Sequence, residues 1–325
     1  MKPNNNIAKK PVLAVDIGGT KILATIISPD YKIMAEERLA SVAFEGPDAV
    51  ISRIFSGIDT MLGQYKCQQL HSISIASAGI IDTNQGIITH SPNLPGWVNM
   101  PLRGIIKDRY KMDTHLINDA SAAALSEHRF GAGRGLYDLV YVTVSTGIGG
   151  GIIIDGRLYT GASGCAGEVG HMIIDAAGQE CLCGSRGCLE ALSSGIAMAR
   201  EAVKRMKNGE NTLLRQMSGG NTDKITAELI ADAARRGDKL AIDVINQAAS
   251  YLGMGLANIV NIFNPEMIII GGGVSKMGGL LFEPAKRVMN EKAFKLPAGA
   301  VRVVPAELGD NMGVLGAAVF ALEQE

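Results

Sequence analysis

The alternation of apolar and polar positions predicts an α/β protein, in which short buried strands are separated by amphipathic helices. Apolar runs predict strands at Pro11–Val15, Ile22–Ile27, Ser72–Ala76, Thr114–Ile117, Asp138–Val144, Ile152–Ile154, Met267–Ile270 and Val301–Val304. Helical spacing of apolar residues predicts a helix that begins near Pro47, an Ala-rich helix after Asp119, and helices over Ser194–Met206, Thr226–Arg235, Lys239–Phe263 and Gly313–Leu322.

One pattern of strand, glycine-rich turn and strand occurs twice, about 130 residues apart. The first copy contains DIGGTK at Asp16–Lys21, and the second contains STGIGGG at Ser145–Gly151. Self-similarity at this distance indicates two related α/β halves. We therefore expect a small N-terminal domain over residues 1–119, completed by the C-terminal helix at about 305–325, and a larger domain over residues 120–304. A cleft between two such domains is a common place for a small-molecule site.

Three glycine-rich turns beside strands, DIGGTK, STGIGGG and IIGGGVS, predict a cradle for the phosphates of a nucleotide. Peptide N–H groups in such turns can approach anionic oxygens closely. A single turn of this kind is explained equally well by the need of a tight hairpin for glycine. Neither a P-loop nor a dinucleotide-binding fingerprint is present. Asp16 is either a turn carboxylate or, as we favour, a group near Mg²⁺.

Two further segments carry polar residues that suit catalysis and sugar recognition. Asp119, in LINDASAAA, lies where a strand meets a helix, so Asn118 or Asp119 could cap the helix. The functional alternative makes Asp119 a general base that takes the proton of a substrate hydroxyl during phosphoryl transfer. Asn93, in the loop SPNLPGW, offers both a donor and an acceptor to a polyhydroxylated ligand, or belongs to a structured turn around Trp97.

The segment GEVGHMIIDAAGQECLCGSRGCLE, from Gly167 to Glu190, predicts a structural zinc site. Three thiolates and one imidazole complete a tetrahedral set, which leaves no position for water. The alternative is a group of ordinary buried thiols, but clustered Cys and His residues usually bind metal. Glu168 and Glu190 are interleaved with the ligands. The expected ligands are His171, Cys181, Cys183 and Cys188.

Composition narrows the class of protein. The chain has 325 residues, of which 47% are hydrophobic and 19% charged, so it is long enough for two domains with cores. A net charge of -1 argues against a broad nucleic-acid-binding surface. No apolar run reaches membrane-spanning length, and the N-terminus has no secretory signal. With an odd cysteine count, this indicates a reducing, cytoplasmic setting in which Cys67 and Cys165 are free thiols.

The motifs DIGGTK, SPNLPGW, NDASAAA, STGIGGG and GEVGH…CLCGSRGCLE occur in an order that resembles the ROK family (repressors, ORFs and sugar kinases). The resemblance extends from Val12 to the last helix. It implies an actin-like ATPase (ribonuclease H-like) fold, with two α/β domains flanking a cleft. It also implies a homodimer and phosphorylation of a sugar hydroxyl by ATP and Mg²⁺, with glucose to glucose 6-phosphate favoured. A kinase for N-acetylmannosamine or N-acetylglucosamine is the alternative.

The resemblance also assigns roles by position. Asp119 is similar to the family's catalytic base. Its sugar-binding positions are matched by Asn93, Asn118, Glu168, His171 and Glu190, and its zinc ligands by the four residues named above. Its phosphate contacts are matched by Gly18, Gly19, Thr20, Lys21, Thr146, Gly147, Gly149 and Gly150, to which the third glycine-rich turn adds Gly271 and Gly272.

Two readings without catalysis compete with a kinase. A transcriptional repressor of this family carries a helix-turn-helix domain ahead of the kinase-like part. Here only about ten residues precede the first expected strand, and a segment of that length is too short for a three-helix domain that binds the major groove of DNA. A sugar-sensing protein without DNA-binding domain is the other alternative, and Asp119 argues against it because a sensor has no use for a base.

Overall fold

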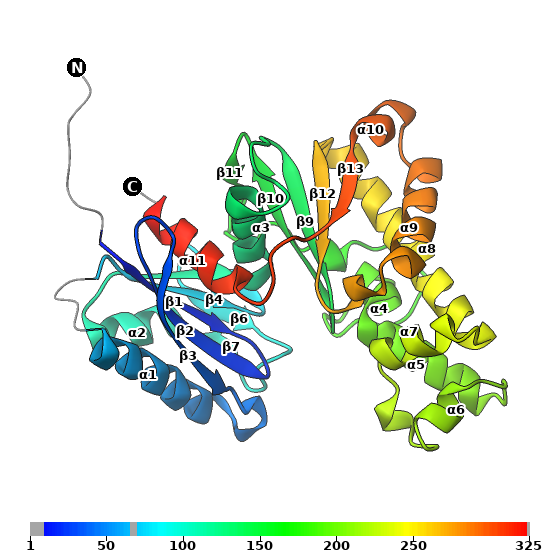
Figure 1. The fold of residues 1–325 in the computed structure, drawn as a ribbon, viewed down its shortest axis with the longest axis horizontal. Helices are drawn as coiled ribbons and strands as arrows, with labels where there is room; N and C mark the ends of the chain where they lie inside the picture. Colours follow the sequence, from blue (N-terminus) through cyan, green and yellow to red (C-terminus); the bar gives the residue numbers. More distant parts are fainter. Residues whose placement is uncertain (1–9, 66–69, 324–325) are drawn as a thin grey trace. The chain divides into compact units, whose positions relative to one another are not determined.

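The computed structural model describes residues 10–65 and 70–323, so the expectation for Cys67 lies outside the described residues. The chain forms two compact units (Figure 1). Unit 1 contains the described residues up to Phe130, the segment Leu158–Ala166 and the described residues from Leu308 onward. Unit 2 contains Gly131–Arg157 and Gly167–Glu307. The units divide after residue 130 because the Ala-rich helix that follows Asp119 packs within unit 1. The assignment of functional domains stays a prediction.

Unit 1 is built on a five-stranded mixed sheet with the strand order β3-β2-β1-β4-β8. The strands are β1 (Val12–Ile17), β2 (Lys21–Ile27), β3 (Ile33–Ala40), β4 (Ile73–Ser77) and β8 (Thr114–Asn118). The predicted hairpin of β1 and β2 is confirmed as an antiparallel pair, and β1, β4 and β8 run parallel. The edge strand β3 was not expected, because three of the eight residues in its sequence IMAEERLA are charged and none of the eight is buried.

Helices cover both faces of the unit 1 sheet (Figure 1). Helices α1 (Pro47–Gln64) and α2 (Leu102–Tyr110) pack on one face, where Gly57 of α1 lies against Ala24 and Leu39. Helices α3 (Asp119–Phe130) and α11 (Met312–Leu322) pack on the other face. A small antiparallel sheet completes the unit, with β5 (Ile80–Asp82), β6 (Ile87–His90) and β7 (Val98–Met100).

Unit 2 repeats the arrangement with a sheet in the order β11-β10-β9-β12-β13. The strands are β9 (Leu139–Val144), β10 (Ile148–Ile154), β11 (Arg157–Leu158), β12 (Met267–Gly271) and β13 (Arg302–Pro305). The expectation that STGIGGG forms one long turn is wrong, because Gly149–Gly151 pair with β9 as part of β10 and only residues 145–147 turn. Gly150 is needed for packing, since a Cβ there would lie 2.8 Å from the Gly167 carbonyl oxygen.

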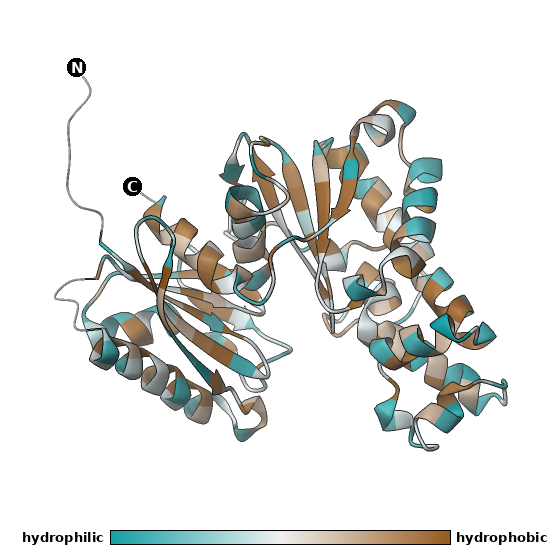
Figure 2. Cartoon of the chain, in the orientation of Figure 1, coloured by the Kyte–Doolittle hydropathy of each residue, from teal (hydrophilic) through white to brown (hydrophobic). Residues whose placement is uncertain are grey.

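The helices of unit 2 pack their apolar faces into one large core (Figure 2). Ser194 and Thr226, expected as first helical residues, are N-caps whose side chains accept peptide N–H groups. Gly253 and Gly255 of α8 allow close packing, against Val288 and Leu189 respectively. The helices are α4 (Leu189–Ser193), α5 (Gly195–Lys207), α6 (Leu214–Met217), α7 (Ala227–Arg235), α8 (Lys239–Phe263), α9 (Gly279–Lys292) and α10 (Lys295–Ala300).

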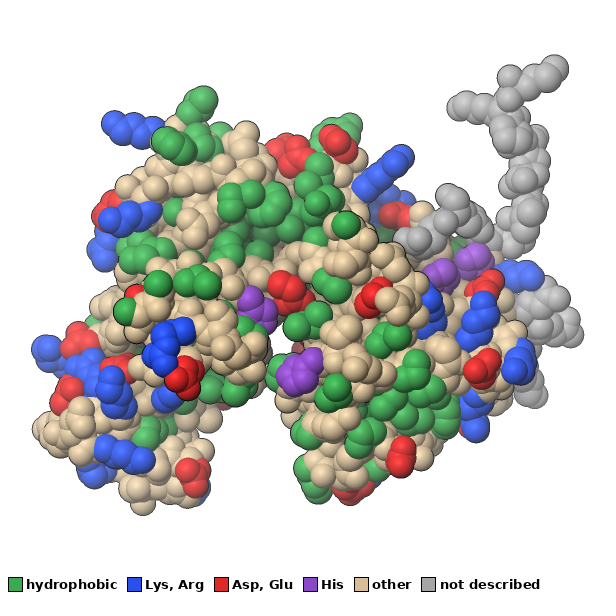
Figure 3. Space-filling view, turned by 180° about the vertical axis from the view of Figure 1, so that it is seen from behind, with side chains coloured by type: hydrophobic (Ala, Val, Ile, Leu, Met, Phe, Trp, Pro, Cys, Tyr) green, Lys and Arg blue, Asp and Glu red, His purple; other side chains and the backbone are tan. Residues whose placement is uncertain are grey.

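Short 3₁₀ helices connect these elements, and the surface carries both signs of charge. The 3₁₀ helices are η1 (Ala43–Glu45), η2 (Val169–His171), η3 (Thr222–Lys224) and η4 (Val274–Met277). On the face that Figure 3 shows, Lys and Arg side chains are interspersed with Asp and Glu side chains. Within residues 10–65 and 70–323, none of the helices combines the length and the apolar character that a bilayer crossing requires.

We expect Gly316→Ala to destabilise unit 1, because a Cβ at this position would lie 1.8 Å from the Ala122 carbonyl oxygen where α11 crosses α3. Overpacking of this kind typically costs about 1–3 kcal/mol. Thermal unfolding followed by circular dichroism measures the effect. The control is Gly63→Ala in α1, where a Cβ meets nothing within 4 Å. That variant should gain about 0.4–1 kcal/mol, and equal effects of the two substitutions would contradict the packing argument.

Candidate functional site

Two carboxylates lie at the same edge of the unit 1 sheet. Asp16 is near the end of β1, and Asp119 follows directly after β8 as the first residue of α3. Because β1 and β8 run parallel, through β4, their carboxyl ends meet at one edge of the sheet. The helix α11 closes over Asp16, since a Cβ on Gly313 would lie 2.5 Å from the Asp16 carboxyl carbon. The sequence motifs that hold these residues are thus brought together by the fold.

Burial makes both carboxyl groups weaker acids than usual. It raises the pKa of Asp16 to about 7, and the nearby Asp119 carboxylate adds to this effect while the Lys21 ammonium opposes it. Burial also raises the pKa of Asp119 to about 6, against the effect of hydrogen bonds from Ala120 and Asn118. A carboxylate with a pKa near neutrality holds a proton more strongly and is a better general base than an exposed one.

Asn118 caps the helix that Asp119 begins. The Asn118 Oδ1 atom accepts hydrogen bonds from the peptide N–H groups of Ala120 at 2.9 Å and Ser121 at 3.1 Å. Its Nδ2 atom donates to the Gly79 carbonyl oxygen at 3.0 Å. Asp119 Oδ1 also accepts from Ala120. Since Asn118 satisfies two of the free N–H groups at the start of α3, capping alone does not explain a second carboxylate at this junction.

The loop SPNLPGW lies against the DIGGTK turn. Gly19 fits only as glycine, because a Cβ there would lie 2.8 Å from the Asn93 carbonyl oxygen. The loop is fixed at its start by Ser91, whose Oγ donates to Ala78 O at 2.8 Å, and at its end by the buried Trp97. Asn93 itself is exposed. The predicted phosphate turn and the predicted sugar loop are therefore neighbours within unit 1.

In unit 2 the four predicted zinc ligands converge on one point. One ligand atom from each of them lies within 4.8 Å of all the others. The Cys183 and Cys188 sulfurs are 3.7 Å apart, and Cys181 Sγ is 3.8 Å from His171 Nδ1. Thiolates at about 2.3 Å from a tetrahedral zinc would be about 3.8 Å apart, so the cluster has the dimensions of such a site. Cys165 is a free cysteine outside the cluster, as expected.

Glu168 and Glu190 flank this cluster in different ways. Glu168 Oε2 is 4.0 Å from His171 Nε2, so the imidazole presents one nitrogen to the cysteines and the other to a carboxylate. Glu190 Oε2 accepts the N–H of Ile148 at 2.9 Å. Gly147 leaves room for this contact, because a Cβ there would lie 2.3 Å from the same oxygen. The zinc segment and the turn at residues 145–147 are thereby joined.

A cavity of about 570 Å³ lies between the second and third glycine-rich turns. Ser145 and Thr146 line one side, and Gly273 and Val274 line another. Gly271 and Gly272 do not line it. They pack on β9 instead, and a Cβ on Gly272 would lie 2.4 Å from Val144 O. Sequence reasoning missed wall residues from α7, η4 and the turn before α7, among them Ile225, Thr226, Glu228, Arg235, Lys276 and Met277.

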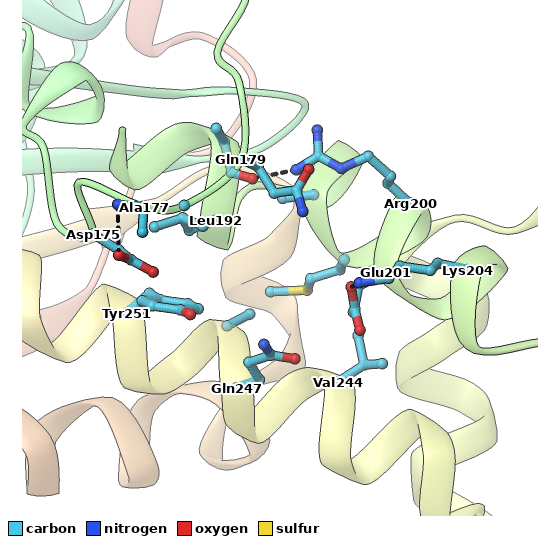
Figure 4. Close-up of a pocket in the computed structure, with 15 residues that line it drawn as sticks. Asp175, Ala177, Gln179, Leu192, Arg200, Glu201, Lys204, Val244, Gln247 and Tyr251 are labelled. Carbon is cyan, nitrogen blue, oxygen red and sulfur yellow. Dashed lines mark hydrogen bonds and ion pairs between the residues drawn. The ribbon is translucent and has the colours of Figure 1, made fainter. Parts of the chain in front are cut away.

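A second, smaller cavity of about 240 Å³ lies behind the zinc segment (Figure 4). Asp175 and Gln179 of that segment line it together with Tyr251 of α8, which lies beside Asp175. Arg200 of α5 donates to the Ala191 carbonyl oxygen of α4. This contact ties α4, the helix that carries Glu190, to the body of unit 2.

Comparison with known proteins assigns the family. The model described as the ROK family matches residues 12–324. The chain belongs to the ROK family. A glucokinase of Thermotoga maritima is 36% identical over 316 residues, which cover 97% of this chain and 98% of that protein. A xylose repressor of Caldicellulosiruptor bescii is 39% identical over 244 residues, 75% of this chain and 60% of that protein.

The fold of this ROK protein is also similar to that of a solved structure. The structure of a ROK family glucokinase from Streptomyces griseus, in complex with glucose and AMPPNP, is 33% identical with a TM-score of 0.80, covering 95% of this chain and 98% of that one. The α/β, actin-like fold expected from the resemblance is therefore confirmed. The cluster of one histidine and three cysteines is typical of the ROK zinc-binding motif.

The raised pKa of Asp16 predicts a stability that falls as the pH rises. The folded protein holds this proton up to about pH 7, whereas the unfolded chain loses it near 3.8. The contribution of the group is therefore fully present below pH 3.8 and is lost as the pH rises to about 7. At pH 8, Asp16→Asn should be more stable than the wild type. We expect a melting temperature about 2–4 °C higher, which corresponds to about 1 kcal/mol.

The experiment compares melting temperatures at pH 5 and pH 8 without added Mg²⁺. The control is Asp108→Asn in α2, because the Asp108 side chain is 87% exposed. That variant should follow the wild-type pH dependence. If Asp16→Asn were no more stable than the wild type at pH 8, the charged Asp16 carboxylate would not destabilise the folded protein, and the prediction would be wrong.

Proposed function

We propose that this ROK protein is an ATP-dependent sugar kinase, which transfers the γ-phosphoryl group to a hexose hydroxyl, with the 6-hydroxyl of glucose as the favoured acceptor. The observation that carries the proposal is the half-buried Asp119 at the start of α3, with a pKa raised to about 6 and the capping role taken by Asn118. Glucokinases that match this chain over almost their full length support the same activity.

In this mechanism Asp119 takes the proton of the attacking hydroxyl as the new P–O bond forms. Its elevated pKa makes it basic enough to accept the proton yet ionised at neutral pH. In unit 1, Asn93 and Asn118 are proposed to position the sugar. The exposed Asn93 amide offers a donor and an acceptor to hydroxyl groups, whereas Asn118 offers the one Nδ2 hydrogen that it does not donate to Gly79. In unit 2, we propose the same role for Glu168, Glu190 and the Nε2 atom of His171.

ATP and Mg²⁺ supply the phosphoryl group and the charge neutralisation that this reaction requires. The cavity of about 570 Å³ in unit 2 is within the size range of small-ligand sites and is proposed to hold the nucleoside. Peptide N–H groups of residues 145–147 and of the turn at residues 18–20 are proposed to contact phosphate oxygens. Asp16 is proposed to hold Mg²⁺, which prefers one or two carboxylates with phosphate oxygens.

A sugar sensor without catalysis is the second candidate, favoured by the 39% identity with a xylose repressor over 244 residues. Such a protein would bind the sugar but would not turn it over. Homodimerisation stays a prediction. Kinases for N-acetylmannosamine and N-acetylglucosamine remain alternatives to glucokinase, because discrimination depends on space near the sugar C2 atom.

The kinase proposal predicts ADP release that depends on sugar, ATP and Mg²⁺. A coupled assay across glucose, mannose, fructose, allose, N-acetylmannosamine and N-acetylglucosamine measures it, and we expect glucose to give the highest kcat/KM. Turnover should rise with pH through about 6 as Asp119 ionises. Binding of glucose without turnover of any sugar in this series would favour the sensor.

The control for catalysis is Asp119→Asn, which keeps the shape of the side chain and removes the base. We expect kcat to fall roughly 10²–10⁴-fold, the usual range of general-base catalysis. Glucose affinity, measured by calorimetry, should change far less. Near-normal turnover in this variant would mean that Asp119 has only a structural role, as the first residue of α3.

The zinc proposal predicts about one zinc per chain, because the four ligands form one closed site. Cys183→Ser should lose the metal, lower the melting temperature and weaken glucose binding, since His171 and Glu168 are held by the same segment. The matched control is Cys165→Ser, which removes a thiol outside the cluster and should keep the zinc. A metal-free protein with full stability and activity would contradict a structural zinc.

A further inference from the structure

Two cations of unit 1 share one carboxylate oxygen beside the DIGGTK turn. Lys21 Nζ is 3.6 Å from Asp310 Oδ2, and Arg38 Nη1 is 3.5 Å from the same atom. Lys21 belongs to the turn that we propose to contact phosphate. Arg38 lies on β3, a strand without any sequence motif. A carboxylate oxygen of Asp310 thus lies between Lys21, an expected phosphate contact, and a second cation, Arg38.

Strand pairing places Arg38 in line with Asp16. Arg38 of β3 pairs with Leu23 of β2, and Leu23 pairs with Asp16 of β1. Paired residues on neighbouring strands project from the same face of a sheet, and neighbouring strands lie about 4.8 Å apart. The Cα atoms of Arg38 and Asp16 are therefore about 10 Å apart on the face that α11 covers. A polyphosphate chain near Asp16 and Lys21 would come within reach of the Arg38 side chain.

The segment that carries Asp310 is anchored to α3. The N–H of Leu308 donates to Oε1 of the fully buried Glu127 at 2.8 Å, and Ser126 Oγ donates to the Met312 carbonyl oxygen. Both anchors come from the helix that begins at Asp119. The fold therefore fixes the backbone on both sides of Asp310 and sets its carboxylate opposite the two cations.

The contacts of Asp310 leave both cations available to a competing anion. The side chains of Lys21, Arg38 and Asp310 are 33%, 50% and 73% exposed. Exposed ion pairs contribute little to stability. The two contacts of Asp310 are also longer than a normal hydrogen bond between nitrogen and oxygen. A phosphate group with several anionic oxygens would make charge-assisted hydrogen bonds to both, and guanidinium is well suited to this.

We propose that Arg38 is a second binding residue for the terminal phosphates of the nucleotide, next to Lys21, and that the Asp310 carboxylate occupies both cations until a phosphate replaces it. This assignment rests on the proposed kinase function, because it takes the DIGGTK turn as a phosphate contact. It makes Asp310 a competitor of the phosphoryl donor, so the two side chains have opposite effects on nucleotide affinity.

Calorimetric titration of the zinc-loaded protein with AMPPNP, ADP or AMP, in the presence of Mg²⁺, tests the proposal. Arg38→Gln should weaken AMPPNP binding roughly 10-fold, as expected for the loss of one charge-assisted hydrogen bond. ADP should lose less and AMP nothing, because AMP lacks the terminal phosphates. Arg38→Lys should keep part of the affinity. The control is Arg53→Gln, which breaks a similar ion pair with Glu45 away from the turn and should change nothing.

Asp310→Asn provides the opposite test. It removes the competing carboxylate and keeps the side-chain shape, so AMPPNP should bind several-fold more tightly than to the wild type. In an Arg38→Gln background this gain should shrink, since one of the two released cations is absent. Unchanged AMPPNP affinity in Arg38→Gln, an equal loss for AMP, or weaker binding in Asp310→Asn would each overturn the proposal.

These outcomes separate the proposal from the kinase function on which it rests. A protein that binds AMPPNP with the expected dependence on Arg38, yet phosphorylates no sugar, would support the Arg38 contact and overturn the kinase. A wild-type protein that binds no adenine nucleotide would overturn both. Active phosphorylation with no effect of Arg38→Gln on AMPPNP binding would overturn only the Arg38 contact.

Discussion

The burial of two carboxylates at one edge of the unit 1 sheet is the constraint around which that unit is arranged. Loss of solvation raises the cost of ionising both Asp16 and Asp119, and the Asp119 charge adds to that cost at Asp16. A fold selected for stability alone would put apolar groups there. The surrounding elements accommodate them. Asn118 accepts N–H groups at the start of α3, Gly313 lets α11 approach Asp16, and the positive charge of Lys21 favours the ionised form of Asp16. An unfavourable burial of charge that several neighbouring residues accommodate is typical of a functional site.

Glycine has two distinct uses in this chain, and they explain where sequence reasoning succeeded and failed. At the DIGGTK turn the expected hairpin is present, and Gly19 is required by the Asn93 loop. In STGIGGG the same residue type forms a strand, where Gly150 allows the close approach of the Gly167 backbone and the Val169 side chain. A run of glycines does not distinguish a turn from a close approach of two segments, because only the partner segment decides between them.

The parts of the fold and site that sequence could predict are those specified by nearby residues. The zinc ligands lie within one segment of 18 residues, from His171 to Cys188, and the long helix α8 has an uninterrupted apolar period. By contrast, β3 has alternating exposed charges, and α9 contains Gly279 and Pro284, so neither has a local signal. Arg38 and Asp310 meet only through strand register and through the segment that returns to unit 1. Contacts between residues so far apart in sequence have no local signature.

The zinc segment shows why a metal is needed where a core is lacking. The ends of the segment, at Val169 and Leu189, are buried in the main core of unit 2, but the cluster at the ligands contains only Cys181, Cys188 and Ala191. Between these ends, Leu182 and Ile173 are 78% and 58% exposed. So little buried apolar surface is insufficient to order a loop of this length. Coordination by four ligands would supply the missing stabilisation, because metal-binding energy acts directly as folding energy. The histidine would then gain a fixed ring orientation, with Nδ1 on the metal and Nε2 directed at Glu168. A structural metal could in this way set the direction of a polar group without taking part in the reaction.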